Sequence, residues 1–147
     1  MNETYTSFIH FHVTYSKVFV FIAIVLTFRS LYGWIRNKEF TKWDNFLGVL
    51  FLFFLYTDLI QGIILYFFLK RPDEAWSTIE AMKYSSIRFW AIKHFSVMLF
   101  VVILSQIGRI FTTRKIESRK KFKYAFFYFG VATFITVGSV GAYLLSR

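Results

Sequence analysis

The sequence predicts an all-α integral membrane protein, a bundle of four helices that run up, down, up and down across a bilayer. Of its 147 residues, 56% are hydrophobic and 23% are aromatic, which is more apolar surface than a soluble domain of this size can bury. The apolar residues gather in four segments, each long enough to cross ~30 Å of hydrocarbon, which takes ~20 helical residues. The basic residues fall between these segments rather than along one face, a pattern typical of membrane topology and not of nucleic-acid binding.

The four predicted spans cover residues 8–34, 46–69, 88–111 and 124–145, and together they form a single transmembrane domain over residues 1–147. The first span is the least uniform, because its uninterrupted apolar stretch is short and is bounded by Lys17 and Arg29. The N-terminus has neither the basic region nor the small-residue cleavage site of a signal peptide, so we expect the first span to be retained. The absence of cysteine excludes disulfides, thiolate metal sites, iron–sulfur clusters and covalently attached haem.

The loops predict the orientation. The first loop is basic, and the third has seven basic residues against one acid, whereas the second loop is balanced. The positive-inside rule therefore places the first and third loops in the cytoplasm and both termini outside it. The basic residues of the third loop are explained by topology alone. The alternative is that this loop binds anionic lipid or a cytoplasmic partner. The basic residues are Arg36, Lys38 and Lys42 in the first loop and Arg109, Arg114, Lys115, Arg119, Lys120, Lys121 and Lys123 in the third.

The three histidines fall at the outer ends of two spans. His10 and His12 open the first span, and His94 lies six residues after Arg88 in the third. Because both spans run inward at 1.5 Å per residue, we expect these histidines at similar depths near the outer surface. In an up-down-up-down bundle the first and third helices lie diagonally across a shared interior, where facing side chains build cofactor sites.

This placement suits one b-type haem whose iron is ligated by His94 and by either His12 or His10. His10 and His12 are about 200° apart around a helix, so only one of them can face the interior. We favour His12 because it lies deeper. A zinc or copper ion bound by all three histidines is a second hypothesis, which requires the first helical turn to be unwound. In the third hypothesis the histidines are ordinary interfacial side chains.

Lys17 and Arg88 are candidates to pair with the haem propionates near the outer surface. Lys17 stands seven residues after His10 and shares its helical face. Without a haem, the Lys17 side chain would extend to the lipid headgroups.

Asp58 is an ionisable residue inside the second span, about 18 Å from Lys70 at 1.5 Å per residue. An acid at this depth is costly and by default marks a functional site. We expect Asp58 to face the bundle interior. There it is either a neutral hydrogen-bonding group between helices, the partner of a cation such as Lys17, or a proton relay toward a haem or quinone.

No catalytic constellation is visible: the sequence has no nucleophile–base pair, no HExxH and no Gly-rich phosphate loop. We therefore predict no catalytic residue, and favour a non-catalytic or electron-transfer subunit over an enzyme. His94 and Met98 are four residues apart and share a helical face, so they are expected to line the same pocket.

Three stretches, IHFH, SLYGWIRNKEFTKWDNFLG and RFWAIKHFSVMLFVVILSQIGR, together resemble a family of small four-helix inner-membrane proteins of Bacteroidota labelled cytochrome b. The most specific elements are HxH at His10 and His12, the KEFTKxDxxLG loop, and RFx4Hx3M from Arg88 through His94 to Met98. The resemblance implies a b-type haem. It also implies a bacterial inner membrane, in which the termini outside the cytoplasm would be periplasmic. The sequence departs from the family at Lys93, where an acid often stands, and at Lys17, one place from a usual arginine.

Two functions follow as hypotheses. The first is a small b-type cytochrome-like subunit with one bis-histidine haem near the outer face, acting in electron transfer or linked to a quinone. The alternative is a cofactor-free structural or assembly subunit of a larger membrane complex. The short loops and small mass favour a larger complex or a redox partner in either case. A transporter or channel is supported only by Asp58, since no broken helix or inverted repeat appears in the sequence.

Overall fold

The structure is a computed structural model and describes residues 3–67, 83 and 88–146. Its helices are α1 (Glu3–Ile35), α2 (Lys42–Phe67), the π-helical η2 (Arg88–His94), α5 (Phe95–Arg114) and α6 (Ser118–Leu145). Because η2 continues directly into α5, the described residues form four helices that are long and apolar enough to cross a membrane. The predicted all-α four-helix fold is therefore confirmed.

The helices start earlier or end later than the predicted spans. The first begins at Glu3 instead of residue 8, the second at Lys42 instead of 46, and the fourth at Ser118 instead of 124. The third continues to Arg114, three residues past its predicted end. The predicted end of the second span, residue 69, lies outside the described residues. Hydropathy finds the segment that matches the hydrocarbon, whereas the helix itself continues into the polar headgroup region.

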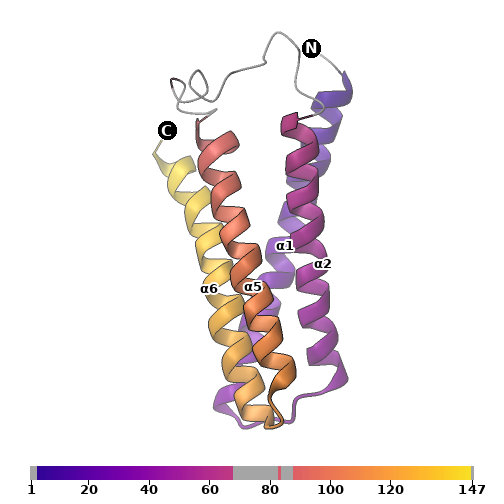
Figure 1. Cartoon of the computed structure of the whole chain (residues 1–147), viewed down its shortest axis with the longest axis vertical. Coiled ribbons are helices and arrows are strands. Elements are labelled where there is room, and N and C mark those ends of the chain that lie inside the picture. Colours follow the sequence, from indigo (N-terminus) through magenta and orange to yellow (C-terminus); the bar gives the residue numbers. More distant parts are fainter. Residues whose placement is uncertain (1–2, 68–82, 84–87, 147) are drawn as a thin grey trace.

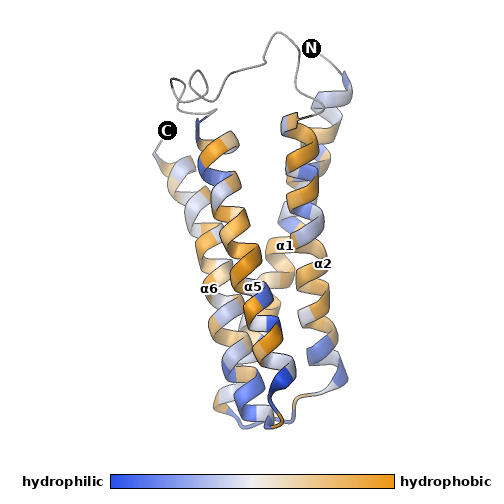
Figure 2. Cartoon of the chain, viewed as in Figure 1, coloured by the Kyte–Doolittle hydropathy of each residue, from blue (hydrophilic) through white to orange (hydrophobic). Residues whose placement is uncertain are grey.

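The four helices surround a common interior (Figure 1). Helix α1 packs against α2 and α6, and α5 packs against the same two helices, so α1 and α5 lie diagonally across the bundle as expected. The α2–α5 contact is the smallest of the four. Figure 2 shows hydrophobic residues over the middle of α2 and α5, with hydrophilic residues at the end that carries the loops after α1 and α5.

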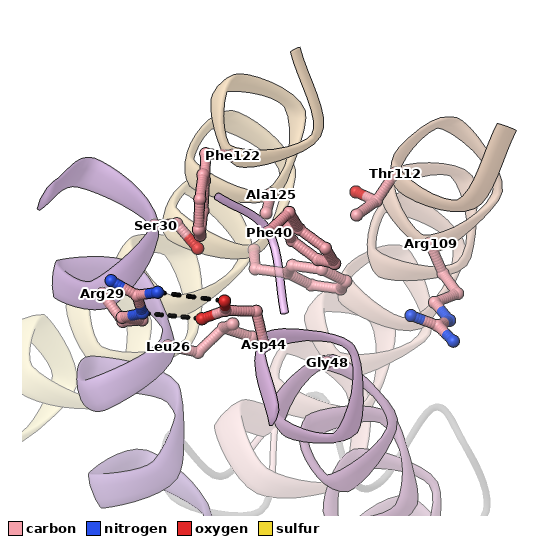
Figure 3. A pocket seen from close by; sticks show the side chains of 11 residues that line it. Leu26, Arg29, Ser30, Phe40, Asp44, Gly48, Arg109, Thr112, Phe122 and Ala125 are labelled. Atoms are coloured by element: carbon pink, nitrogen blue, oxygen red, sulfur yellow. Dashed lines mark hydrogen bonds and ion pairs between the residues drawn. The ribbon is translucent and has the colours of Figure 1, made fainter. Parts of the chain in front are cut away.

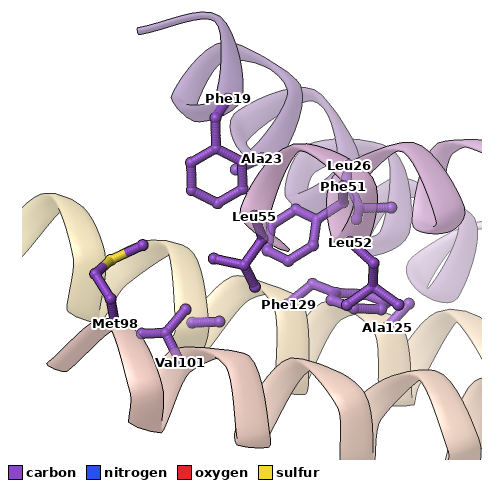
Figure 4. Packing of buried hydrophobic residues seen from close by; sticks show 11 residues of the cluster. Phe19, Ala23, Leu26, Phe51, Leu52, Leu55, Met98, Val101, Ala125 and Phe129 are labelled. Atoms are coloured by element: carbon purple, nitrogen blue, oxygen red, sulfur yellow. The ribbon is translucent and has the colours of Figure 1, made fainter. Parts of the chain in front are cut away.

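The centre of the bundle is an aromatic core (Figure 4). The ring of Phe51 lies 5.2 Å from Phe19 and 4.9 Å from Phe129, measured between centroids. Leu55 and Val101 are fully buried beside these rings. Because lipid tails are as apolar as these side chains, the core stabilises the bundle through close packing rather than through removal from water.

Small residues allow α6 to approach its neighbours closely. A Cβ atom added at Gly108 of α5 would lie 2.3 Å from Cβ of Tyr128, and one added at Gly33 of α1 would lie 2.6 Å from the ring of Phe122. Atoms cannot approach this closely, so both contacts depend on glycine.

Candidate functional site

A cavity of about 70 Å³ lies between α1, α2 and the η2–α5 helix, toward the end where α1 begins. A water molecule needs roughly 10–15 Å³ of such space, so the cavity has room for a few waters. Its two imidazoles and its carboxyl group come from three different helices. They belong to His12 on α1, Asp58 on α2 and His94 on η2.

Asp58 is only 5% exposed and contacts α1. Its Oδ1 accepts a hydrogen bond of 2.7 Å from the Ser16 hydroxyl. The same hydroxyl lies 2.9 Å from the backbone carbonyl of His12, so its single proton is directed to one of these two oxygens at a time. Asp58 Oδ1 also lies 3.3 Å from His12 Nδ1, close enough for an ion pair but without the alignment of a hydrogen bond.

Lys17, a candidate cation for pairing with Asp58, is not its partner. Lys17 is exposed, and the groups that meet Asp58 are His12 and Ser16. His12 and Ser16 are four residues apart and share a helical face, whereas Lys17 lies five residues after His12 and points off that face.

His94 is held by aromatic residues at the junction between η2 and α5. Its ring lies 5.2 Å from the Trp90 ring, edge to face, and 6.1 Å from Phe89. Phe89 stacks on Tyr143 of α6 at 3.9 Å, which fixes η2 against the bundle. The Nδ1 atom of His94 is buried and has no hydrogen-bond partner among the described residues. A π-helical turn at this point is informative, because such turns occur frequently at functional sites.

His10 does not belong to the cavity. It is exposed on α1 while His12 faces inward, as their angular separation requires. Because the first turn is regular helix, the three histidines are not brought together. Among the described residues, no three His, Asp or Glu side chains are placed to bind one metal ion.

Of the other predicted site residues, Met98 is buried and lines the cavity with His94. Arg88 is half-buried at the start of η2, and Lys93 is exposed. Neither lies on the cavity lining, nor does Lys17. Sequence analysis missed Ser16 and Trp90. The spacing of four residues between His12 and Ser16 could have identified the first, whereas Trp90 depends on the π-helical turn.

A second polar cluster lies at the opposite end of the bundle (Figure 3). Arg29 of α1 forms a bidentate pair with Asp44 of α2, with distances of 2.6 Å from Nε to Oδ1 and 3.0 Å from Nη2 to Oδ2. The backbone N–H and the hydroxyl of Thr41 each donate to Asp44 Oδ2 at 2.9 Å. This cluster ties α1 to α2, and the space beside it, about 10 Å³, is no larger than one water.

The fold and the site define a membrane-spanning four-helix bundle with a histidine–aspartate–histidine cavity at one end. Comparisons of the chain with family models, with curated proteins and with solved structures found no match. The resemblance to the cytochrome b-like family of Bacteroidota therefore stays a prediction.

Proposed function

We propose that this protein is a small b-type cytochrome-like subunit of a bacterial inner membrane, which holds one haem between His12 and His94 near the outer face. One observation carries the proposal: two half-buried imidazoles from diagonally opposed helices line the same cavity. Side chains on facing helices build cofactor sites in such bundles, so His12 and His94 would be able to hold the iron of one haem.

The donor groups fit a haem. A carboxylate that accepts a hydrogen bond from one ring nitrogen of a histidine orients the other nitrogen toward a metal. Asp58 Oδ1 lies 3.3 Å from His12 Nδ1, and a small rotation of the imidazole would be needed to align this hydrogen bond. His94 has a buried ring nitrogen without a partner among the described residues. Trp90 and Tyr66 add aromatic surface to the lining, and the cavity would have to widen between them to take a flat macrocycle.

The chain's own residues would orient and isolate the group. Ser16 would hold the Asp58 carboxylate, Asp58 would fix the ring of His12, and the buried surroundings would limit water around the iron. When bound, a haem supplies a one-electron redox couple whose potential depends on its ligands and burial.

The aromatic core supports an electron-transfer role over a channel. Along α2, Leu55 and Phe51 separate Asp58 from Asp44, and along α1, Phe19 and Ala23 separate His12 from Arg29. All four of these apolar residues are buried in one cluster. The two polar ends are thus divided by packed side chains, which suits a site that exchanges electrons at one side of the membrane.

One observation favours the alternative, a cofactor-free subunit of a larger membrane complex. A cavity of about 70 Å³ accommodates water-sized molecules and not a macrocycle. In this alternative, the His12–Asp58 contact is a polar link between helices within the membrane.

A reduced-minus-oxidised absorption spectrum of the detergent-purified protein tests the proposal. We expect the bands of a low-spin b-type haem, with one haem per chain. His94→Ala and His12→Ala should each eliminate the spectrum, whereas His10→Ala, at an exposed position on the same helix, should retain it. A colourless wild-type protein that is folded and helical would leave the cofactor-free subunit as the function.

A further inference from the structure

Arg109 is a cation without an acidic partner at the basic end of the molecule, which we define as the loops after α1 and α5 with the adjoining helix ends. Asp44, which lines the same small pocket as Arg109, binds Arg29 and Thr41 instead. Glu117, in the loop after α5, binds Lys120 at 2.6 Å. In the described part of the chain, no carboxylate lies within ion-pair distance of Arg109. A guanidinium carries five N–H donors, and one of them, on Nη1, donates to the neutral Asn45 Oδ1 at 2.8 Å.

The Arg109 side chain crosses from α5 to α2 at the smallest of the four helix–helix contacts. Its Nη1 lies 3.5 Å from the position that a Cβ of Gly48 would occupy, so the guanidinium reaches the surface of α2 at this glycine. Lys42 is exposed and stands one helical turn before Asn45, on the same face of α2. Asn45 therefore lies between two cations, one on each helix.

These groups lie at the level of lipid headgroups. Arg109 is about 7 Å from the end of α5 at Arg114, counted at 1.5 Å per residue. Trp43, next to Lys42, is 79% exposed and packs edge to face against Phe46. An exposed tryptophan at the end of a membrane helix is typical of the interface between hydrocarbon and water.

We propose that Arg109 and Lys42 bind the phosphate of an anionic phospholipid in the leaflet at the basic end, with the headgroup seated over the α2–α5 contact. Charge complementarity favours an anionic phospholipid, because two cations lie at the level of the headgroups. No acid in the described residues neutralises Arg109. Arginine binds phosphate through two parallel N–H groups, and lysine adds a point charge. This lipid site is independent of the proposed haem.

Native mass spectrometry of protein released from nanodiscs with equal amounts of phosphatidylglycerol and phosphatidylcholine tests the proposal. The wild-type protein should retain phosphatidylglycerol preferentially. Arg109→Gln and Lys42→Gln should each lower the ratio of retained phosphatidylglycerol to phosphatidylcholine about fivefold, the expected effect of one cation near an anionic membrane surface. Arg119→Gln is the matched control, since it removes the same charge from an exposed position on α6 and should leave the ratio nearly unchanged.

Three results would overturn the proposal. Equal losses in all three variants would indicate a diffuse basic surface, and an unchanged ratio in Arg109→Gln and Lys42→Gln would exclude these residues. Release of the lipid by millimolar glycerol 3-phosphate would show that the site takes a free phosphate ester. Helix content is measured for each variant by circular dichroism. Lys42→Gln, at an exposed position, keeps the test decisive if Arg109→Gln does not fold.

Discussion

Replacing Gly108 by alanine tests how closely α5 and α6 approach. The added Cβ would lie 2.3 Å from Cβ of Tyr128 and 2.9 Å from its Cγ. The position of Cβ is fixed by the backbone, so no rotation of the Tyr128 side chain relieves the closer of the two contacts. The first separation has to grow to at least 3.4 Å, the lower limit of ordinary contact, and this requires the two helices to move apart.

The expected change in the free energy of unfolding has two parts. Alanine is better than glycine inside a helix by about 1 kcal/mol. Overpacking costs about 1–3 kcal/mol, and a backbone displacement of this size belongs at the upper end. Gly108→Ala should therefore destabilise the protein by about 2 kcal/mol net. Gly138→Ala is the matched control, because nothing lies within 4 Å of its added Cβ on α6, and it should be neutral or stabilise by up to about 1 kcal/mol.

Reversible unfolding in mixed detergent–SDS micelles, followed by circular dichroism, measures both variants. Gly33→Ala provides an intermediate case, since its Cβ would meet the outer ring atoms of Phe122, at the far end of a side chain. The expected order of stability is Gly138→Ala, then Gly33→Ala, then Gly108→Ala. If Gly108→Ala proves as stable as Gly138→Ala, the close approach of α5 and α6 is wrong.

Three further predictions concern Asp58, Asp44 and topology. Asp58→Asn should leave folding intact in the same unfolding assay, because an amide oxygen still accepts a hydrogen bond from Ser16. If Asp58→Asn prevents accumulation of the protein and Asp58→Glu does not, a charge at this position is obligatory. Asp44→Ala should lower the free energy of unfolding by about 2–3 kcal/mol, less than for a fully buried pair, because the Arg29 side chain is 32% exposed. Glu117→Gln breaks a fully exposed pair and is its control, with almost no change expected. A reporter active only in the cytoplasm and fused after Arg147 should stay silent, whereas strong activity would reverse the proposed orientation.

The fold was predictable because a backbone surrounded by lipid can adopt few structures. Each crossing segment has to satisfy its own hydrogen bonds, so apolar length alone identifies the helices. The helix ends were not predictable in this way. The charged residues after Ser118 are helical in α6 although they are too polar for the hydrocarbon, and the same holds for the polar start of α1.

The depth of the candidate site in the membrane was predictable from the sequence, but its side-chain contacts were not. Counting residues along helices places His12 and His94 at one end of the molecule, and both line one cavity. The partner of Asp58 depends on how α1 is rotated against α2, and no single-sequence pattern gives that rotation. For this reason the sequence offered Lys17 only as a candidate partner, whereas His12 and Ser16 contact Asp58 in the structure. The π-helical turn before Phe95 has no clear sequence signal either. It is accompanied by contacts between helices, such as the Phe89–Tyr143 stack, and a single sequence does not show these contacts.

The aromatic core also has an electrical consequence. In a membrane that carries a potential, the voltage falls across the parts of the protein that exclude water and ions, and the layer around Phe19, Phe51 and Phe129 is such a part. Asp58 lies about 13 Å along α2 from Phe67, counted at 1.5 Å per residue. A charge that enters the cavity from this end therefore crosses a fraction of the voltage, and the whole voltage is worth about 2.3 kcal/mol per charge at 100 mV. Electron or proton exchange at the cavity is accordingly expected to respond to membrane potential, while the basic end stays in contact with the opposite solution.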